Sequence, residues 1–205
     1  PTGKSAVDLT FDLKDTKWVA GNHVTYLLST TKIITLNMGS VTYPQWQTVE
    51  GSAFTSEKLK DSYANDDALG MYVVDKNNKV IEENLKFTYK DGKWIVGPEK
   101  KFKGSPQYNY FVYYPYQKGG LPGAPAKDAS NIDVTSAASF FDKAIKVWCN
   151  KFDTSRGQTI DQSDIAKMNS FDLQIGKADV LGESGTTINF RSMKHAMGLA
   201  EIVLG

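Results

Sequence analysis

Apolar and polar residues alternate near the start of the chain, a pattern typical of half-buried strands. The first such segment has apolar side chains at every second position, Val7, Leu9, Phe11 and Leu13. A second strand follows at Val24, Tyr26 and Leu28, and shorter strands are predicted at Ile33–Leu36 and Val41–Tyr43. The polar, irregular stretch from Gln47 to Asp67 predicts a loop.

The middle of the chain predicts paired strands joined by turns. A strand is predicted at Leu69–Val74, followed by turn residues from Asp75 to Asn78, because Asn tolerates left-handed backbone angles. Leu85, Phe87 and Tyr89 alternate, Asp91-Gly92 favours a turn, and Trp94–Val96 returns, which is the signal of a hairpin. Tyr108–Tyr116 predicts another strand, which Pro115 should end or push to a sheet edge. A glycine- and proline-rich loop follows.

The pattern changes to helical spacing at Ser136–Phe152, which predicts an amphipathic helix with Ser136 as its N-cap. A second short helix is expected at Ile160–Met168, and a brief strand at Leu173 and Ile175 before Gly176. The last strand is predicted from Thr187 to Leu204, with a bulge near Gly198. We therefore expect a mainly β protein, an antiparallel β-sandwich with one or two short inserted helices.

Composition narrows the possible functions. The formal net charge is +1, from 24 basic and 23 acidic residues, whereas nucleic-acid binders usually have a basic excess on one face, so no nucleic-acid partner is expected. No apolar run approaches the roughly 18 residues of a membrane-spanning helix. Pro1–Thr10 has no apolar core of a signal peptide, so we expect any export signal to have been removed.

Candidate chemistry is sparse. Cys149 is the one cysteine, and we expect a small buried apolar residue there rather than a reactive thiol. His23 and His195 have no second metal ligand at useful spacing, so packing or surface roles are expected. The neighbouring carboxylates Asp66-Asp67 and Glu82-Glu83 should point to opposite faces of a strand and cannot converge on one bond. We therefore expect no enzyme activity, cofactor or metal, although a pairing of distant carboxylates stays open.

The tyrosines of the predicted strand 108–116 have two interpretations. Exposed rings could stack on sugars, with Tyr108, Tyr110, Tyr113 and Tyr114 as the candidate ligand-stacking residues. The favoured interpretation is a core strand with rings on both faces, because large rings dominate core energetics.

Five short segments, in order, resemble the fimbrillin-like proteins of Bacteroidetes, which are subunits of surface pili built by donor-strand assembly. They are NDDALGMY at 65–72, FTYKDGKW at 87–94, YFVYYPY at 110–116, DLQIGKADV at 172–180, and the stretch Ile188–Leu204. The resemblance implies that residues 47–205 form a domain like the family's N-terminal domain, a transthyretin-like sandwich.

Residues 1–46 carry a second resemblance, to the closing strands of a fimbrillin C-terminal domain, which here would pack into the same sandwich. In an ordinary subunit those strands come last, so the family order is broken. A junction of a tandem array, a rearranged chain and a coincidental match all stay open. Pilins of this family are often trimmed after an arginine near the N-terminus, and because no arginine precedes Arg156, any such step here is either complete or absent.

The resemblance implies a non-enzymatic cell-surface protein, a pilus subunit or tip adhesin, exported to the outer membrane or pilus. Its partners would be other pilin subunits joined by strand addition, and possible host proteins or glycans. Val7, Leu9, Phe11 and Leu13 suit a donated strand that fills a partner's groove, and they suit an ordinary strand within the chain equally well. A surface glycan-binding module on the same scaffold is the alternative.

Overall fold

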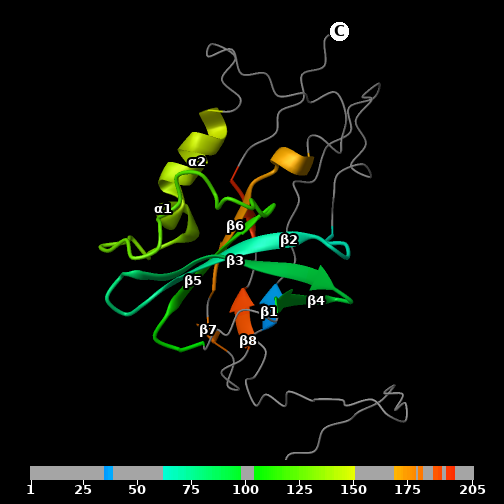
Figure 1. The fold of residues 1–205 in the computed structure, drawn as a ribbon, viewed down its shortest axis with the longest axis horizontal. Helices are drawn as coiled ribbons and strands as arrows, with labels where there is room; N and C mark the ends of the chain where they lie inside the picture. The colour runs from blue at the N-terminus through cyan, green and yellow to red at the C-terminus, as the bar shows by residue number, and fades with distance from the viewer. Residues whose placement is uncertain are drawn as a thin grey trace, which may run out of the picture. The chain divides into compact units, whose positions relative to one another are not determined.

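The computed structural model describes residues 35–38, 62–97, 104–150, 169–178, 180–181, 187–190 and 193–196. All of these residues belong to one compact unit that spans residues 31–205. They form a mainly antiparallel β-sandwich with few short helices, which confirms the predicted fold class (Figure 1). The elements are β1 Thr35–Met38, β2 Ala68–Val74, β3 Val80–Lys90, β4 Lys93–Val96, β5 Asn109–Tyr114, α1 Ala137–Phe140, α2 Asp142–Cys149, β6 Gln174–Lys177, β7 Val180–Leu181, β8 Thr187–Phe190 and β9 Lys194–His195.

The strands are hydrogen-bonded in the order β7-β8-β1-β4-β3-β2-β5-β6-β9. Neighbouring strands are antiparallel except β1 and β8, which run parallel with Thr35 opposite Thr187 and Met38 opposite Phe190. β1 therefore lies inside the sheet, between β4 on one side and β8 on the other.

The sheet folds over on itself, so that strands far apart in the hydrogen-bonded order come into contact. A Cβ atom added to Gly176 of β6 would lie 2.7 Å from Met193 Sδ and 3.6 Å from Phe190 Cδ1 of β8. β6 and β8 are separated by five strands in the hydrogen-bonded order. The two ends of the sheet thus form the facing layers of the sandwich.

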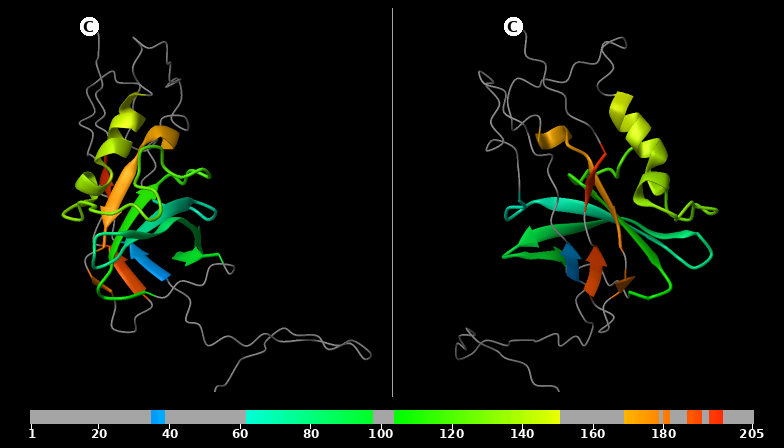
Figure 2. Two further views of the ribbon diagram at one scale, coloured as in Figure 1. Left: turned by 60° about the vertical axis from the view of Figure 1, so that its left-hand side comes forward. Right: turned by 180° about the vertical axis from the view of Figure 1, so that it is seen from behind.

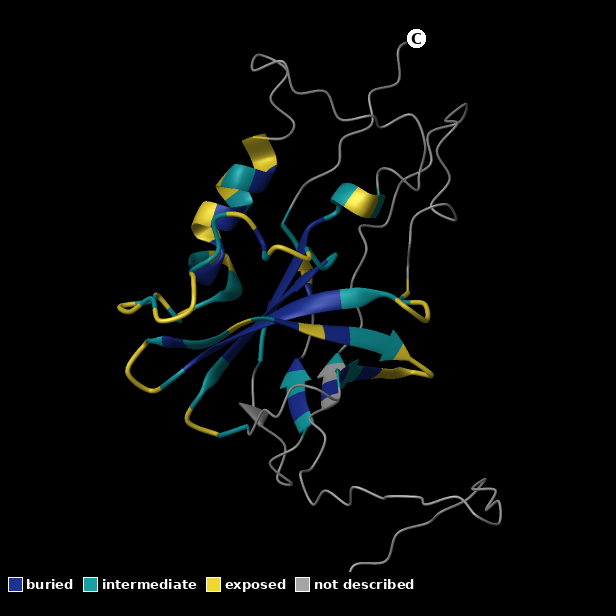
Figure 3. Ribbon diagram, in the orientation of Figure 1, coloured by how far each residue is buried: buried dark blue, intermediate teal, exposed yellow. Residues whose placement is uncertain are grey.

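Two apolar clusters fill the two faces of the sheet. The inner cluster lies between the layers and joins buried residues of β1 to β5 and β8, with Leu36, Phe87, Trp94, Val112 and Ile188 among them. The outer cluster packs α1, α2 and the loop before them against β2, β5, β6 and Val80 at the start of β3. Figures 2 and 3 show the helices beside β6, away from the turn between β3 and β4, with buried residues concentrated in the crossing strands.

The predicted hairpin between β3 and β4 is confirmed. Asp91 and Gly92 form its two-residue turn, with φ angles of 49° and 80°. Positive φ at both central residues characterises the turn type whose twist matches paired strands, and glycine adopts it without steric cost. The preceding turn is confirmed as well, because Asp75 Oδ1 accepts hydrogen bonds from the backbone N–H groups of Asn77 and Lys79.

The helical segment begins where the sequence predicts. Ser136 caps α1 by accepting a hydrogen bond from the Ser139 N–H at 3.0 Å. The single predicted helix is instead two consecutive helices, because Phe141 between them has a non-helical ψ of 10°. The aromatic side chain of Phe141 is buried in the outer cluster, so the break places Phe140 and Phe141 side by side against the sheet.

The prediction of one continuous strand from Thr187 is wrong in the part that the structure describes. Residues 187–190 form β8 beside β1, whereas residues 194–195 form β9 beside β6. Met193 between them is buried in the inner cluster. Because the sheet folds over, two short strands that follow one another in the chain reach opposite ends of the hydrogen-bonded order.

Smaller differences concern strand limits. β1 covers residues 35–38 and so includes Thr35 and Leu36 of the predicted strand, whose first two residues lie outside the described residues, and β6 begins at Gln174 and continues through Gly176. The strands predicted at residues 7–13, 24–28 and 41–43 and the short helix at 160–168 lie outside the described residues. The proposed domain boundary at residue 46 stays a prediction.

Candidate functional site

The place of β1 in the sheet is the first candidate site. β1 pairs with β8 over all four of its residues and with β4 through Thr35 and Leu36. Leu36 is only 4% exposed and belongs to the inner cluster, against which Met38 also packs. A segment remote in sequence from β4 and β8 thus satisfies the backbone of both strands and closes the core between them.

The predicted donor strand, with Val7, Leu9, Phe11 and Leu13, lies outside the described residues. Its role in strand pairing therefore stays a prediction.

Of the four predicted ligand-stacking tyrosines, three lie in the protein core. Tyr110, Tyr113 and Tyr114 are 2%, 0% and 7% exposed, and only Tyr108 is partly exposed. Tyr110 and Tyr114 face the inner cluster, whereas Tyr113 faces the outer one. Their rings therefore lie on both faces of a core strand, the interpretation favoured from sequence.

The hydroxyl groups of the three buried tyrosines are all hydrogen-bonded. Tyr113 donates to Asn84 Oδ1 at 2.6 Å, Tyr114 donates to Asp67 Oδ1 at 3.1 Å, and Tyr110 donates to the Ser105 carbonyl at 2.7 Å. Burial raises the pKa of Tyr110 and Tyr113, since the charged phenolate is poorly solvated there. The three hydroxyl groups hold loops to β5, and those of Tyr110 and Tyr113 stay protonated at neutral pH.

A chain of polar side chains that sequence analysis missed connects β9 to β6 and to the segment before β2. His195 Nδ1 lies 2.7 Å from Asp172 Oδ1, and Gln174 Nε2 donates to Asp172 Oδ2 at 3.0 Å. The Tyr63 hydroxyl donates to Gln174 Oε1 at 2.9 Å, and Gln174 is only 1% exposed. Asp172 and Gln174 alternate along the chain, but nothing in the sequence indicates that the distant His195 and Tyr63 join them.

The carboxylate pairs considered from sequence have separate roles. Asp67 accepts hydrogen bonds from the Ala64 N–H and the Tyr114 hydroxyl, whereas Glu83 accepts one from the Lys127 N–H. Among the described residues, no group of three His, Cys, Asp or Glu side chains is arranged to hold a metal ion.

The expectation of a buried Cys149 is wrong, because this residue is exposed. It lies at the end of α2, whose buried face is formed by Ala144 and Trp148.

In the described part of the chain, no helix has the length and apolar character needed to cross a membrane. Sequence comparison finds no matching protein-family model and no matching curated protein.

Solved structures that are similar to this chain include two Bacteroides proteins. The first is a fimbrial protein from Bacteroides ovatus ATCC 8483, with 20% identity, a TM-score of 0.48, and coverage of 81% of this chain and 28% of that one. The second is a "putative cell adhesion protein" from Bacteroides uniformis ATCC 8492, with 13% identity, a TM-score of 0.42, and coverage of 80% and 46%. The chain therefore spans less than half of either protein, and both identities are too low to transfer function.

Proposed function

We propose that this chain is a non-enzymatic cell-surface protein, a pilus subunit or tip adhesin that assembles by strand donation. The observation that carries the proposal is the insertion of β1 between β4 and β8. If β1 left the sheet, both neighbours would present unpaired backbone groups and the inner cluster would open at Leu36. A strand donated by another subunit would restore both the hydrogen bonds and the burial.

The segments that resemble fimbrillin-like proteins support the proposal. The matching stretches at 65–72, 87–94 and 110–116 supply β2, the β3–β4 hairpin and β5, and the stretch at 172–180 supplies β6. The resemblance therefore covers consecutive elements of the sheet rather than loops. A transthyretin-like arrangement of these strands, export to the cell surface, and a boundary near residue 46 are parts of this proposal.

The test weakens the resident strand and offers a replacement. In the full chain, Leu36→Asp should disfavour β1 by placing a charge in the inner cluster. A synthetic peptide spanning Ser5–Asp15 is then added, with a peptide carrying Leu9→Asp and Phe11→Asp as the matched control. We expect a stable complex with the first peptide only, measured by size-exclusion chromatography.

If the L36D variant does not fold alone, recovery of its β-sheet circular dichroism by the first peptide is the expected result. Failure of that peptide and of a second one spanning Thr31–Ser40 to bind or to restore folding would contradict strand donation.

A further inference from the structure

The outer face of the β3–β4 hairpin carries three lysines. Leu85 and Phe87 face the inner cluster, so strand alternation places Lys86, Thr88 and Lys90 on the opposite face. On β4, Trp94 faces inward, and Lys93 and Ile95 face outward. Lys90 pairs directly with Lys93, and Thr88 pairs with Ile95. We call Lys86, Lys90 and Lys93, with Thr88 and Ile95 between them, the hairpin lysine face.

This face is open to solvent. All three lysines are exposed, and the helices and the loop before them cover β2, β5, β6 and the start of β3 around Val80 instead. The hairpin turn lies on the side of the sheet away from α1 and α2 in every view (Figures 1 and 2). A partner can therefore reach the lysines without any rearrangement of the fold.

Among the described residues, none of the three lysines of this face forms an ion pair. Like charges directly opposite each other on paired strands are destabilising, and Lys90 and Lys93 are such a pair. The lysine–carboxylate ion pairs among the described residues are Lys79–Asp128 and Lys146–Asp142, neither of which involves the hairpin. Asp91 in the turn is hydrogen-bonded to Asn65. An external anion would relieve the repulsion.

The residue types on the face indicate which kind of anion fits. Lysine offers a single point charge without the planar fork of arginine, so it suits isolated carboxylate or sulfate groups better than base edges or paired carboxylates. Ile95 is partly buried and is the one aliphatic side chain of the face, and the face has none of the arginine anchors typical of protein interfaces.

A partly exposed aromatic ring extends the face. Tyr116 lies beside it, with Lys86 Nζ 5.5 Å from the ring centroid, and a sugar ring could stack there. Lys86 and Lys90 are four residues apart on one strand, which corresponds to about 13 Å. The charges are therefore spread over a length that matches an extended polymer rather than a small ion.

We propose that the hairpin lysine face binds an acidic polysaccharide, with the lysines contacting its carboxylate or sulfate groups and Tyr116 contacting a sugar ring. This binding does not depend on strand donation. A chain that takes up no donated strand would still bind the polymer, so the two proposals fail separately.

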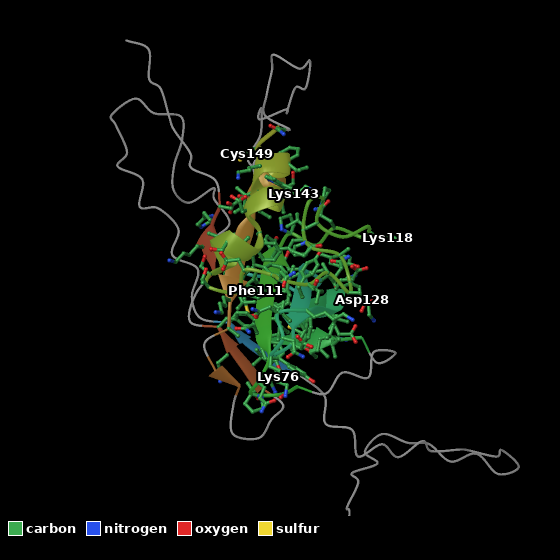
Figure 4. All side chains as sticks on the ribbon, turned by 90° about the vertical axis from the view of Figure 1, so that its left-hand side faces the viewer. Lys76, Phe111, Lys118, Asp128, Lys143 and Cys149 are labelled. Atoms are coloured by element: carbon green, nitrogen blue, oxygen red, sulfur yellow. The ribbon has the colours of Figure 1, made fainter. Side chains whose placement is uncertain are left out.

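The test uses the full chain and hyaluronate, with uncharged dextran as the control polymer, in calorimetric titrations at low and raised salt. The variant K86Q/K90Q/K93Q removes the three positive charges of the hairpin lysine face. The variant K76Q/K118Q/K143Q removes three positive charges from exposed lysines in other parts of the surface (Figure 4). Both variants lower the formal net charge of +1 by the same three units. Tyr116→Ala tests the aromatic contact.

We expect hyaluronate binding that weakens with salt, and no dextran binding. The hairpin variant should lose affinity by about tenfold, since each exposed charge contact contributes modestly, and the control variant should be unchanged. Tyr116→Ala should weaken hyaluronate binding several-fold. Absence of hyaluronate binding, equal losses in both lysine variants, or tighter binding of polyglutamate or single-stranded DNA than of hyaluronate would overturn the proposal.

Discussion

At the scale of single residues, Gly70 shows how the absence of a side chain permits a buried polar contact. The Tyr113 ring crosses β2 over Gly70, where an added Cβ atom would lie 2.2 Å from Tyr113 Cε1 and 2.7 Å from Asn84 Oδ1. The Tyr113 hydroxyl donates to Asn84 and accepts from the Gln117 N–H at 3.1 Å. The ring thereby holds the loop after β5 against β3.

Gly70→Ala should therefore destabilise the fold. The ring cannot move aside without breaking its hydrogen bonds, so we expect a loss of about 1–3 kcal/mol, the usual cost of overpacking. Urea unfolding monitored by circular dichroism measures it. Gly119→Ala is the matched control, because an added Cβ atom there meets nothing within 4 Å. Equal stabilities of the two variants would contradict this account.

Burial of tyrosines also makes the stability of the fold decrease at high pH. Burial, the largest cause, raises the pKa of Tyr72 to about 12, and it raises the pKa of Tyr113 as well. The unfolded chain ionises tyrosine near pH 10, so the stabilising contribution is complete below that pH and is lost as the pH rises through the folded value.

We therefore expect the free energy of unfolding to fall between about pH 10 and about pH 12. Tyr72→Phe should make this fall shallower, even if its stability at neutral pH changes through loss of the 3.4 Å hydrogen bond from the Leu121 N–H. Denaturant unfolding at several pH values measures the slope. Parallel pH profiles for the variant and the unsubstituted chain would show that Tyr72 ionisation is not involved.

At the scale of elements, the helical segment depends on its cap and on its contact with the sheet. Ser136 satisfies the Ser139 N–H, and Phe140 stacks on Phe111 of β5 with ring centroids 4.1 Å apart and planes inclined by 3°. Farther along, Trp148 Nε1 donates to the Phe171 carbonyl at 2.9 Å. A local signal starts the helix, and contacts with the sheet hold it in place.

Ser136→Ala should cost about 1 kcal/mol of stability, because the Ser139 N–H would lose its acceptor. Ser136→Asp keeps an acceptor at the same position, and its free energy of unfolding should stay within a few tenths of a kcal/mol of that of the unsubstituted chain. Thermal unfolding followed by far-ultraviolet circular dichroism measures both variants. A loss of similar size in the two would mean that Ser136 contributes through some contact other than the cap.

At the scale of the whole molecule, the inner cluster joins segments from distant parts of the chain. Leu36 of β1, Trp94 of β4 and Ile188 of β8 belong to the same cluster although about 150 residues separate the first from the last. The strands they belong to are short, so side-chain burial rather than strand length must hold them together.

Leu36→Ala should therefore loosen both neighbours of β1. We expect a loss of about 2–5 kcal/mol, typical of truncating a buried leucine. Hydrogen exchange should accelerate at β8 more than at β2. Leu69→Ala truncates a fully buried leucine of β2 in the same cluster and should not accelerate hydrogen exchange selectively at β8. Selective acceleration at β8 in both variants, or in neither, would contradict the dependence of β8 on β1.

The sequence by itself determined the local elements of this protein. Asp91-Gly92 between alternating strands predicted the hairpin, Pro115 predicted the end of β5, and Ser136 predicted the helix start, because each depends on backbone preferences of neighbouring residues. The outward orientation of the lysines of the hairpin lysine face also follows from strand alternation, once the inward side of the strands is known.

Tertiary structure alone decided which strands lie side by side. The insertion of β1 between β4 and β8, the division of residues 187–195 between two ends of the sheet, and the His195–Asp172–Gln174–Tyr63 chain all join residues far apart in sequence. Local preferences carry no information about such pairings, because they depend on how the folded sheet brings its two ends together. Burial of Tyr110, Tyr113 and Tyr114 was decided in the same way, by what packs against each face of β5.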